Sequence, residues 1–291
     1  MALTDEQTKE FEELESEAEG LDELIDVADG IADAGDKEWA KKIYEKALEK
    51  AEESDDYRSL ADSIHENLGD KQWAKKLYKK AEDKIEDYDN SFDLANSICK
   101  YLGDTEWAKK IYKQTENLVN DSWGFSALAN SLCEYLDDKE WAKKVYKKAE
   151  EVESYKYFKY LGDSICQNLD DKEWANKIYK KAEDKTETSS DFIKLADSLL
   201  EKLSEKEWAK KVYEKAEEIT EEYSDHKKLA DSIYGNLGDQ EWAKMIYKKA
   251  EQNAEDSYDY ESLAESIRDN LGDAKWAKSL EKKAKELEDA E

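Results

Sequence analysis

Four residues of metal-binding type occupy one position of a repeating pattern. His65, Cys99 and Cys133 follow one another at 34 residues, and Cys166 follows after 33. Zinc holds imidazole and thiolate ligands at about 2.0–2.3 Å. Equivalent residues of stacked repeats lie at least one helix-packing distance apart, about 8–10 Å. One ion therefore cannot bind all four residues, and we expect neither a metal nor another cofactor. We interpret them as small, semi-apolar surface residues.

The stretch from Asp87 to Asp93 alternates oxygen-bearing side chains, as the start of a calcium-binding loop does. Such a loop needs a glycine at its sixth position and a bidentate glutamate at its twelfth. Phe92 and Ile98 stand at those places. We interpret the stretch as a polar turn that caps the next helix.

Side chains for acid–base or nucleophilic catalysis are few. The two histidines, His65 and His226, fall five repeats apart, so no triad can contain both. Carboxylate pairs are plentiful but lie on repetitive, solvated faces, and the sequence has no glycine-rich phosphate loop. We therefore expect that the chain is not an enzyme.

A tryptophan register defines the elements that position these residues. Eight tryptophans recur at steps of 34 residues, with one step of 33, and Trp123 alone stands outside the register: Trp39, Trp73, Trp107, Trp141, Trp174, Trp208, Trp242 and Trp276. Each unit contains two amphipathic helices, A and B, because apolar residues recur at three and four residues in both halves. In one unit these are Leu60, Ala61 and Ile64, then Ala74, Leu77, Tyr78 and Ala81. We interpret the Trp, Tyr and Ala rows of helix B as core, not as an aromatic binding platform.

A Gly-Asp pair such as Gly69-Asp70 separates helix A from helix B. Glycine takes the left-handed conformation that ends a helix, and aspartate caps the next one. Asp137, Asp170 and Ser204 replace the glycine in the middle repeats, at a higher conformational cost. A single pair cannot bury both apolar faces, so the pairs must stack. The pattern predicts an all-α fold, a right-handed α-solenoid of about eight antiparallel helix pairs. A capping helix over residues 1–20 would precede the array over residues 21–291, which ends in a polar helix.

The chain resembles a tetratricopeptide (TPR) array over residues 21–288. The resemblance rests on the period, on Leu60-Ala61 in helix A, on the Gly69-Asp70 turn and on the Ala, Tyr, Ala series of helix B. The closing proline of the family is absent, and helix A is one residue longer before the turn in every unit except the first. Sel1-like and half-a-TPR repeats are near alternatives.

The net charge of the chain limits the classes of macromolecule that it can bind. Of 291 residues, 75 are acidic and 46 basic, and the net charge is −29. We therefore expect no direct binding to nucleic acid or to anionic membranes. The three cysteines form an odd set without a CxxC pair, and there is no leader or long apolar segment. A soluble protein of the reducing cytoplasm is expected.

The resemblance implies that the A helices line a concave groove. Two rows of residues would lie there, and the carboxylates of the first row are expected to be exposed. The first row is Asp62, Asn96, Asn130, Asp163, Asp197, Asp231 and Glu265. The second row is His65, Cys99, Cys133, Cys166, Leu200, Tyr234 and Arg268. The acidic first row predicts a protein partner with a basic segment or basic cleft.

Three interpretations of function remain open from the sequence. The chain is a scaffold or adaptor whose groove binds a basic segment, or an acidic decoy that imitates nucleic-acid phosphate and blocks the basic cleft of an enzyme. The third possibility is a designed or consensus-like solenoid without an evolved ligand. Lysine pairs on the B helices, such as Lys143-Lys144, interrupt a phosphate-like surface and favour the scaffold.

Overall fold

The computed structural model describes residues 3–152 and 157–289. Over this part of the chain there are 17 α-helices and no strands, and the protein is 84% helical. The helices pack in adjacent pairs, so the predicted all-α fold with about eight helix pairs is confirmed. The chain divides into two compact units, residues 1–152 and 153–291.

Unit 1 contains a leading helix and four pairs. Its helices are α1 (Asp5–Glu17), α2 (Leu21–Asp33), α3 (Lys37–Leu48), α4 (Ser54–Ser63), α5 (Lys71–Glu82), α6 (Tyr88–Ser97), α7 (Thr105–Leu118), α8 (Ser122–Leu136) and α9 (Lys139–Glu151). From α2 onward, even-numbered helices are A helices and odd-numbered helices are B helices.

Unit 2 contains four further pairs in the same order. Its helices are α10 (Phe158–Leu169), α11 (Lys172–Lys185), α12 (Ser189–Ser198), α13 (Lys206–Ile219), α14 (Tyr223–Ser232), α15 (Gln240–Asn253), α16 (Ser257–Ser266) and α17 (Ala274–Glu288).

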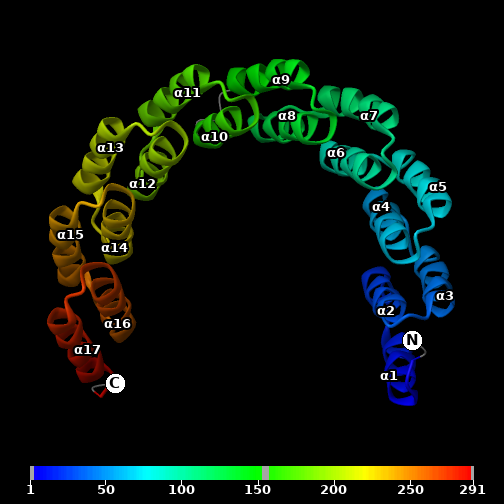
Figure 1. Cartoon of the computed structure of the whole chain (residues 1–291), viewed down its shortest axis with the longest axis horizontal. Helices are drawn as coiled ribbons and strands as arrows, with labels where there is room; N and C mark the ends of the chain where they lie inside the picture. Colours follow the sequence, from blue (N-terminus) through cyan, green and yellow to red (C-terminus); the bar gives the residue numbers. More distant parts are fainter. Residues whose placement is uncertain (1–2, 153–156, 290–291) are drawn as a thin grey trace. The chain divides into compact units, whose positions relative to one another are not determined.

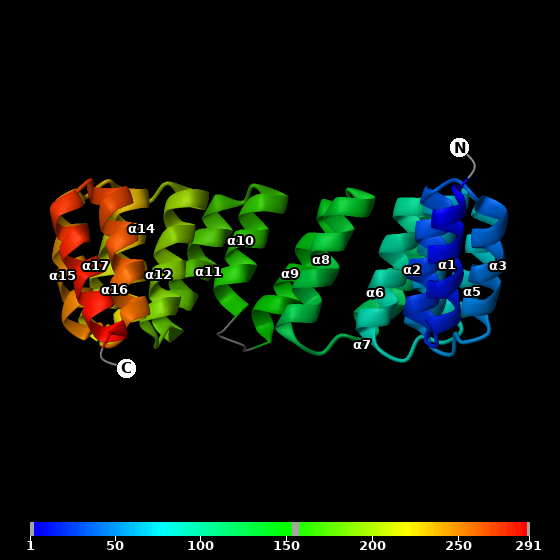
Figure 2. The ribbon, with the colours of Figure 1, turned by 90° about the horizontal axis from the view of Figure 1, so that it is seen from below.

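Within each unit taken by itself, the A helices lie along the inner side of a curved row of pairs and the B helices along the outer side (Figure 1). The helices of a unit run up and down in alternation with nearly aligned axes (Figure 2). Each A helix packs on its own B helix and on the A helix of the next pair in the same unit. The inner face of each unit is therefore built from A-helix side chains.

The core consists of the apolar rows that the sequence predicts. In the pair α4/α5 the side chains of Leu60, Ala61 and Ile64 have no exposed surface, and neither do Tyr78 and Ala81. The whole tyrosine row of the B helices is fully buried, as is most of the alanine row. The tryptophans of the register are only partly buried, except Trp242, which is 8% exposed. Tyrosine rather than tryptophan is thus the central aromatic residue of the core.

The turns between A and B helices follow the predicted chemistry. Gly69 has φ +73°, and the Asp70 carboxylate accepts hydrogen bonds from the backbone N–H groups of Gln72 and Trp73. Asp137, Asp170 and Ser204 adopt the left-handed conformation at φ 49°, 53° and 60°. These side chains carry the steric cost that glycine avoids. The turn after Ser204 also lacks the aspartate cap, because Glu205 makes no side-chain capping bond.

The extra residue of helix A appears as a π-helical turn. Five A helices end in a turn of this kind: η1 (Ile64–Leu68), η2 (Ile98–Leu102), η4 (Leu199–Leu203), η5 (Ile233–Leu237) and η6 (Ile267–Leu271). A π turn holds one more residue than an α turn, so it absorbs an insertion without moving the start of the next helix. Helices α2, α8 and α10 end without one. Of these, α2 has the shorter spacing, whereas α8 and α10 hold the extra residue and stay α-helical to Leu136 and Leu169. The departure from the TPR spacing is therefore accommodated inside helix A.

Candidate functional site

The first predicted row on the A helices lies against the buried tyrosines. In six repeats an oxygen of this row, and in the first repeat the equivalent Asp29, accepts the hydrogen bond of the tyrosine hydroxyl from the B helix of the same pair. The pairs are Tyr44–Asp29, Tyr78–Asp62, Tyr112–Asn96, Tyr146–Asn130, Tyr179–Asp163, Tyr213–Asp197 and Tyr247–Asp231. The O···O distance is 2.6 Å for Tyr78, Tyr112 and Tyr179. We call this set the tyrosine ladder. Glu265 has no such partner, because Glu281 replaces the tyrosine of its repeat.

Neighbouring repeats bind the same carboxylates. The Ser97 hydroxyl donates to Asp62 Oδ2 at 2.9 Å from the next A helix. The Asn270 amide donates to Asp231 Oδ1 at 3.1 Å, and the Asn236 amide reaches Asp197 in the same way. The ladder therefore joins the two helices of a pair and also joins one pair to the next.

The expectation that the first row is exposed is wrong for six of its seven residues, which are partly buried, and holds only for Glu265. The side chains of Asp62, Asp163 and Asp231 are only 17%, 19% and 34% exposed. Each also pairs with a basic side chain one turn earlier: Arg58 at 3.0 Å, Lys159 at 2.8 Å and Lys227 at 3.2 Å. A helical-wheel argument places these residues opposite Leu60 and Ile64. It cannot show that tyrosine hydroxyls from helix B reach the same side.

Burial dominates the electrostatics of the ladder. Burial raises the pKa of Asp62 above its usual value, although the Tyr78 hydroxyl and the Arg58 charge act in the opposite direction. Burial likewise raises the pKa of Asp29. The pKa of the Tyr78 hydroxyl is raised by burial and by the neighbouring Asp62 charge. The tyrosines therefore stay protonated donors at neutral pH.

The second predicted row is heterogeneous in exposure. His65, Cys99, Cys133, Leu200 and Tyr234 are partly exposed, Cys166 is buried, and Arg268 is exposed and paired with Glu281. Neither ring nitrogen of His65 has a hydrogen-bond partner within the described ranges, and the ring packs 5.4 Å from that of Tyr101.

The cysteines of this row are protonated thiols. Burial raises the pKa of Cys99 to about 11, and it also raises the pKa values of Cys133 and Cys166. A thiol is a weak nucleophile compared with its thiolate. Over residues 3–152 and 157–289, no three histidine, cysteine or acidic side chains form a group that could hold a metal ion.

An exposed row of carboxylates, which sequence reasoning missed, lies one helical turn beyond the ladder. Glu66, Glu134, Glu201 and Asp269 each follow a first-row residue by four positions and are exposed. The Glu66 and Glu201 side chains are 54% and 71% exposed. Lys100 lies 3.7 Å from Glu66 and Lys202 lies 2.7 Å from Glu201, but surface pairs of this kind are weak. The i, i+4 spacing with the first row was the signal that could have found them.

Many lysines of the B helices are held by glutamates of the preceding repeat. Glu116 accepts the Trp141 indole N–H at 2.8 Å and pairs with Lys148 at 2.8 Å. The same arrangement recurs at Glu183 with Trp208 and Lys215, at Glu217 with Trp242 and Lys249, and at Glu251 with Trp276 and Lys283. The outer face of each unit thus carries paired charges.

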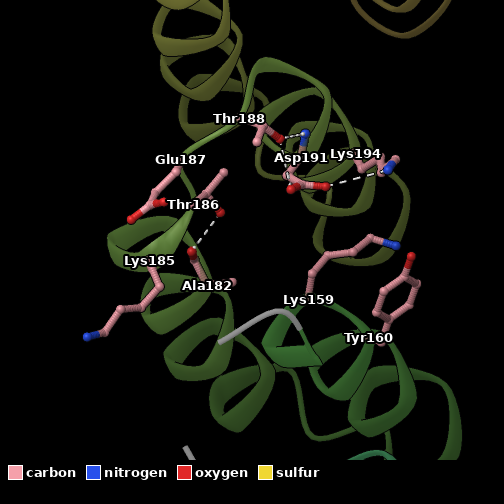
Figure 3. A pocket seen from close by; sticks show the side chains of 9 residues that line it. All are labelled: Lys159, Tyr160, Ala182, Lys185, Thr186, Glu187, Thr188, Asp191 and Lys194. Carbon is pink, nitrogen blue, oxygen red and sulfur yellow. Dashed lines mark hydrogen bonds and ion pairs between the residues drawn. The ribbon is translucent and has the colours of Figure 1, made fainter. Parts of the chain in front are cut away.

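A hollow in unit 2 lies between the start of α10, the end of α11 and the start of α12 (Figure 3). Lys159 lies over the Tyr160 ring at 4.4 Å while it pairs with Asp163. Lys194 lies 3.5 Å from the Asp191 carboxylate, which also accepts the Thr188 hydroxyl at 2.8 Å. These carboxylates neutralise two of the lysines that line the hollow, so it is not a concentrated anion site.

Comparisons with known proteins identify no family for this chain. No protein-family model matches the chain, and no curated protein matches it at the significance required. Among solved structures, the crystal structure of Ton1535 from Thermococcus onnurineus NA1 is 15% identical, covers 97% of this chain and 95% of its own, and has a TM-score of 0.34. Within the described ranges, no helix has the length and apolar character to cross a membrane.

Proposed function

We propose that this chain is a TPR-like interaction scaffold whose acidic A-helix face binds a basic segment of another protein. The observation that supports it most directly is the exposed row of Glu66, Glu134, Glu201 and Asp269 on the A helices. A net charge of −29 attracts basic partners. The hydrogen bonds of the tyrosine ladder occupy the first-row carboxylates, so the exposed row supplies the charges that a partner meets.

Three local features support the TPR-like assignment over an unrelated helical array. They are the antiparallel helix pairs, the left-handed residue that ends each A helix, and the buried Ala, Tyr, Ala series of six of the eight B helices. In the TPR family the A helices line the binding groove, and the inner position of these helices within each unit agrees with that use.

The test compares two variants of equal charge in the full chain. In the first, which we call the A-face variant, Glu66, Glu134 and Glu201 are changed to Gln and Asp269 to Asn. In the control, the exposed B-helix residues Glu106, Glu140, Glu173 and Glu207 are changed to Gln. Binding of a short labelled peptide of alternating lysine and serine is measured by fluorescence anisotropy. We expect the first variant to bind more weakly than the control, by about 0.3–0.5 kcal/mol, or about twofold, for each carboxylate that the bound peptide contacts.

The difference between the two variants should shrink at high salt, because exposed charges are screened over about 8–10 Å near physiological ionic strength. Equal weakening of both variants would mean that the whole acidic surface acts, as in a decoy of nucleic acid. Unchanged binding of the A-face variant would refute the proposed groove.

A further inference from the structure

An aromatic cluster lies on the A helices of unit 1, outside the tryptophan register. It consists of Tyr88 and Phe92 on α6 and Trp123 on α8. The centroids of each pair of rings lie 6.2 to 6.5 Å apart. The rings of Tyr88 and Phe92 are stacked, and the indole of Trp123 is tilted against both. Phe92 is buried, but Trp123 is 46% exposed. The cluster therefore exposes the indole of Trp123, which packs against the rings of Tyr88 and Phe92.

Two local contacts fix the position of these rings. The Tyr88 hydroxyl donates to Asp121 Oδ2 at 2.8 Å, while Oδ1 of the same carboxylate accepts the backbone N–H of Gly124. A Cβ at Gly124 would lie 2.9 Å from Val119 Cγ1 and 3.1 Å from Tyr88 Cε2, so the glycine lets Tyr88 approach α8. These contacts fix the Tyr88 ring, against which the indole packs, and a fixed supporting ring lowers the entropic cost of binding to the indole.

The chain places lysines over comparable rings elsewhere but not here. Four A helices carry an aromatic residue in their first turn or two, and a lysine of the paired B helix lies over its ring: Lys80 over Tyr57, Lys148 over Phe125, Lys181 over Phe158 and Lys283 over Tyr260. In the α6/α7 pair, Ser91 and Gln114 stand at the two corresponding positions. Within the described part of the chain, no lysine or arginine lies over the rings of the cluster.

Negative charge surrounds the cluster. The exposed Asp89 side chain has no hydrogen-bonding or ionic partner among the described residues, and Asp87 and Asp121 lie near it. Burial and these two carboxylates raise the pKa of Asp89. The Arg58 charge acts on the pKa of Asp93, one helical turn after Asp89 on α6, whereas the charges that shift the pKa of Asp89 are both negative. A cation placed there would relieve this repulsion.

We propose that Trp123, Tyr88 and Asp89 form a subsite for an arginine side chain of a partner protein. A guanidinium is planar and weakly hydrated, so it stacks on an indole and still donates two N–H groups to a carboxylate. An ammonium group is more strongly hydrated and cannot stack in this way. The subsite rests on the proposed function, because the arginine would belong to the basic segment that binds the A-helix face.

The test uses the full chain with 15N-labelled tryptophan and Nα-acetyl-arginine methylamide as the probe. The Trp123 indole N–H resonance is assigned by its loss in Trp123→Leu. We expect a saturable shift of this resonance with the arginine probe, at least threefold weaker binding of the lysine analogue, and no saturable shift with the uncharged citrulline analogue. Asp89→Asn should weaken binding of the arginine probe about threefold.

Tyr258→Leu provides the matched control. Tyr258 lies 18 residues before Trp276, as Trp123 lies 18 before Trp141, and it is 74% exposed. Lys227 occupies the place near Tyr258 that Phe92 holds near Trp123, and it pairs with Asp231. This change should leave the titration of Trp123 unaltered. Equal affinity for lysine or citrulline, or unchanged affinity in Asp89→Asn, would overturn the proposal.

The result is independent of the test of the proposed function. The A-face variant keeps every residue of the aromatic cluster, so its Trp123 resonance should respond to the arginine probe as the parent does. Failure of the lysine–serine peptide to distinguish the A-face variant would refute the groove and leave this subsite intact. A silent Trp123 resonance would refute the subsite alone.

Discussion

The tyrosine ladder can be tested at two adjacent rungs that differ in the charge of the acceptor. Tyr78 and Tyr112 are both fully buried in unit 1, and each donates its hydroxyl at 2.6 Å. The acceptor of Tyr78 is the carboxylate of Asp62, whereas that of Tyr112 is the amide oxygen of Asn96. The changes Tyr78→Phe and Tyr112→Phe remove one hydroxyl each and keep the ring that fills the core.

The two costs should differ because hydrogen bonds to charged groups are stronger. A bond to a charged acceptor contributes about 1.5–3 kcal/mol to stability, and a neutral one about 0.5–1.5 kcal/mol. Asp62 keeps its bonds from Ser97 and Arg58 after the change, which favours the lower end of its range. We therefore expect Tyr78→Phe to cost about 2 kcal/mol and Tyr112→Phe about 1 kcal/mol.

Urea unfolding at neutral pH measures both costs, and amide hydrogen exchange in α4 to α7 locates them. The exchange measurement matters because repeats that contact only their neighbours can open separately. Equal costs, or a larger cost for Tyr112→Phe, would refute the argument that the carboxylate strengthens the rung. Loss of amide protection in helices far from α4 to α7 would show that the two hydrogen bonds do not act locally.

Three further predictions follow from particular residues. Because burial raises the folded-state pKa of Asp29, the folded chain binds that proton more tightly, and stability falls as pH rises through the interval between the unfolded and folded pKa values. Asp29→Asn should remove this part of the pH dependence and raise the urea midpoint at pH 7; an unchanged pH profile would contradict it. Ser204→Gly should stabilise the chain by about 1 kcal/mol, because it removes a left-handed serine at φ 60°, and a lower melting temperature would count against this. Trp141→Ala should cost about 3 kcal/mol and Trp123→Ala about 1 kcal/mol, since only the former indole is bonded to a glutamate between repeats; calorimetry that finds equal costs would disprove the difference.

The fold was predictable because the same signals for helix boundaries recur in every repeat. The register from Trp39 to Trp276 and the Gly-Asp pairs define helix boundaries without any tertiary information. The sequence also shows that helix A is one residue longer than in the resembled family. It does not show where the extra residue goes, because a π turn differs from a longer loop only in backbone hydrogen bonding. The division into two compact units likewise leaves no mark in composition.

The site was predictable only in part. Helical spacing correctly places Asp62, Asn96 and Asp163 on one row, but their burial depends on how far the tyrosine of the opposite helix reaches. That reach is set by the packing of two helices, and no spacing within helix A reports it. The aromatic cluster could not be predicted from the sequence for a related reason. Tyr88 and Trp123 lie on different helices at different repeat positions, so no single periodicity links them.

The ladder also restricts which carboxylates a partner can use. A ligand that takes an oxygen of Asp62 must displace Tyr78, Ser97 or Arg58, and the displaced hydroxyl would remain buried without an acceptor. Leaving a buried polar group unpaired costs about 1–3 kcal/mol, which is more than an exposed ion pair returns. Glu66 and Asp89 are exposed, and the groups that bind Glu66, the Tyr101 hydroxyl at 2.9 Å and Lys100 at 3.7 Å, can bind water when they are displaced. Recognition should therefore vary with the exposed positions of each A helix, while the ladder beneath them stays the same from repeat to repeat.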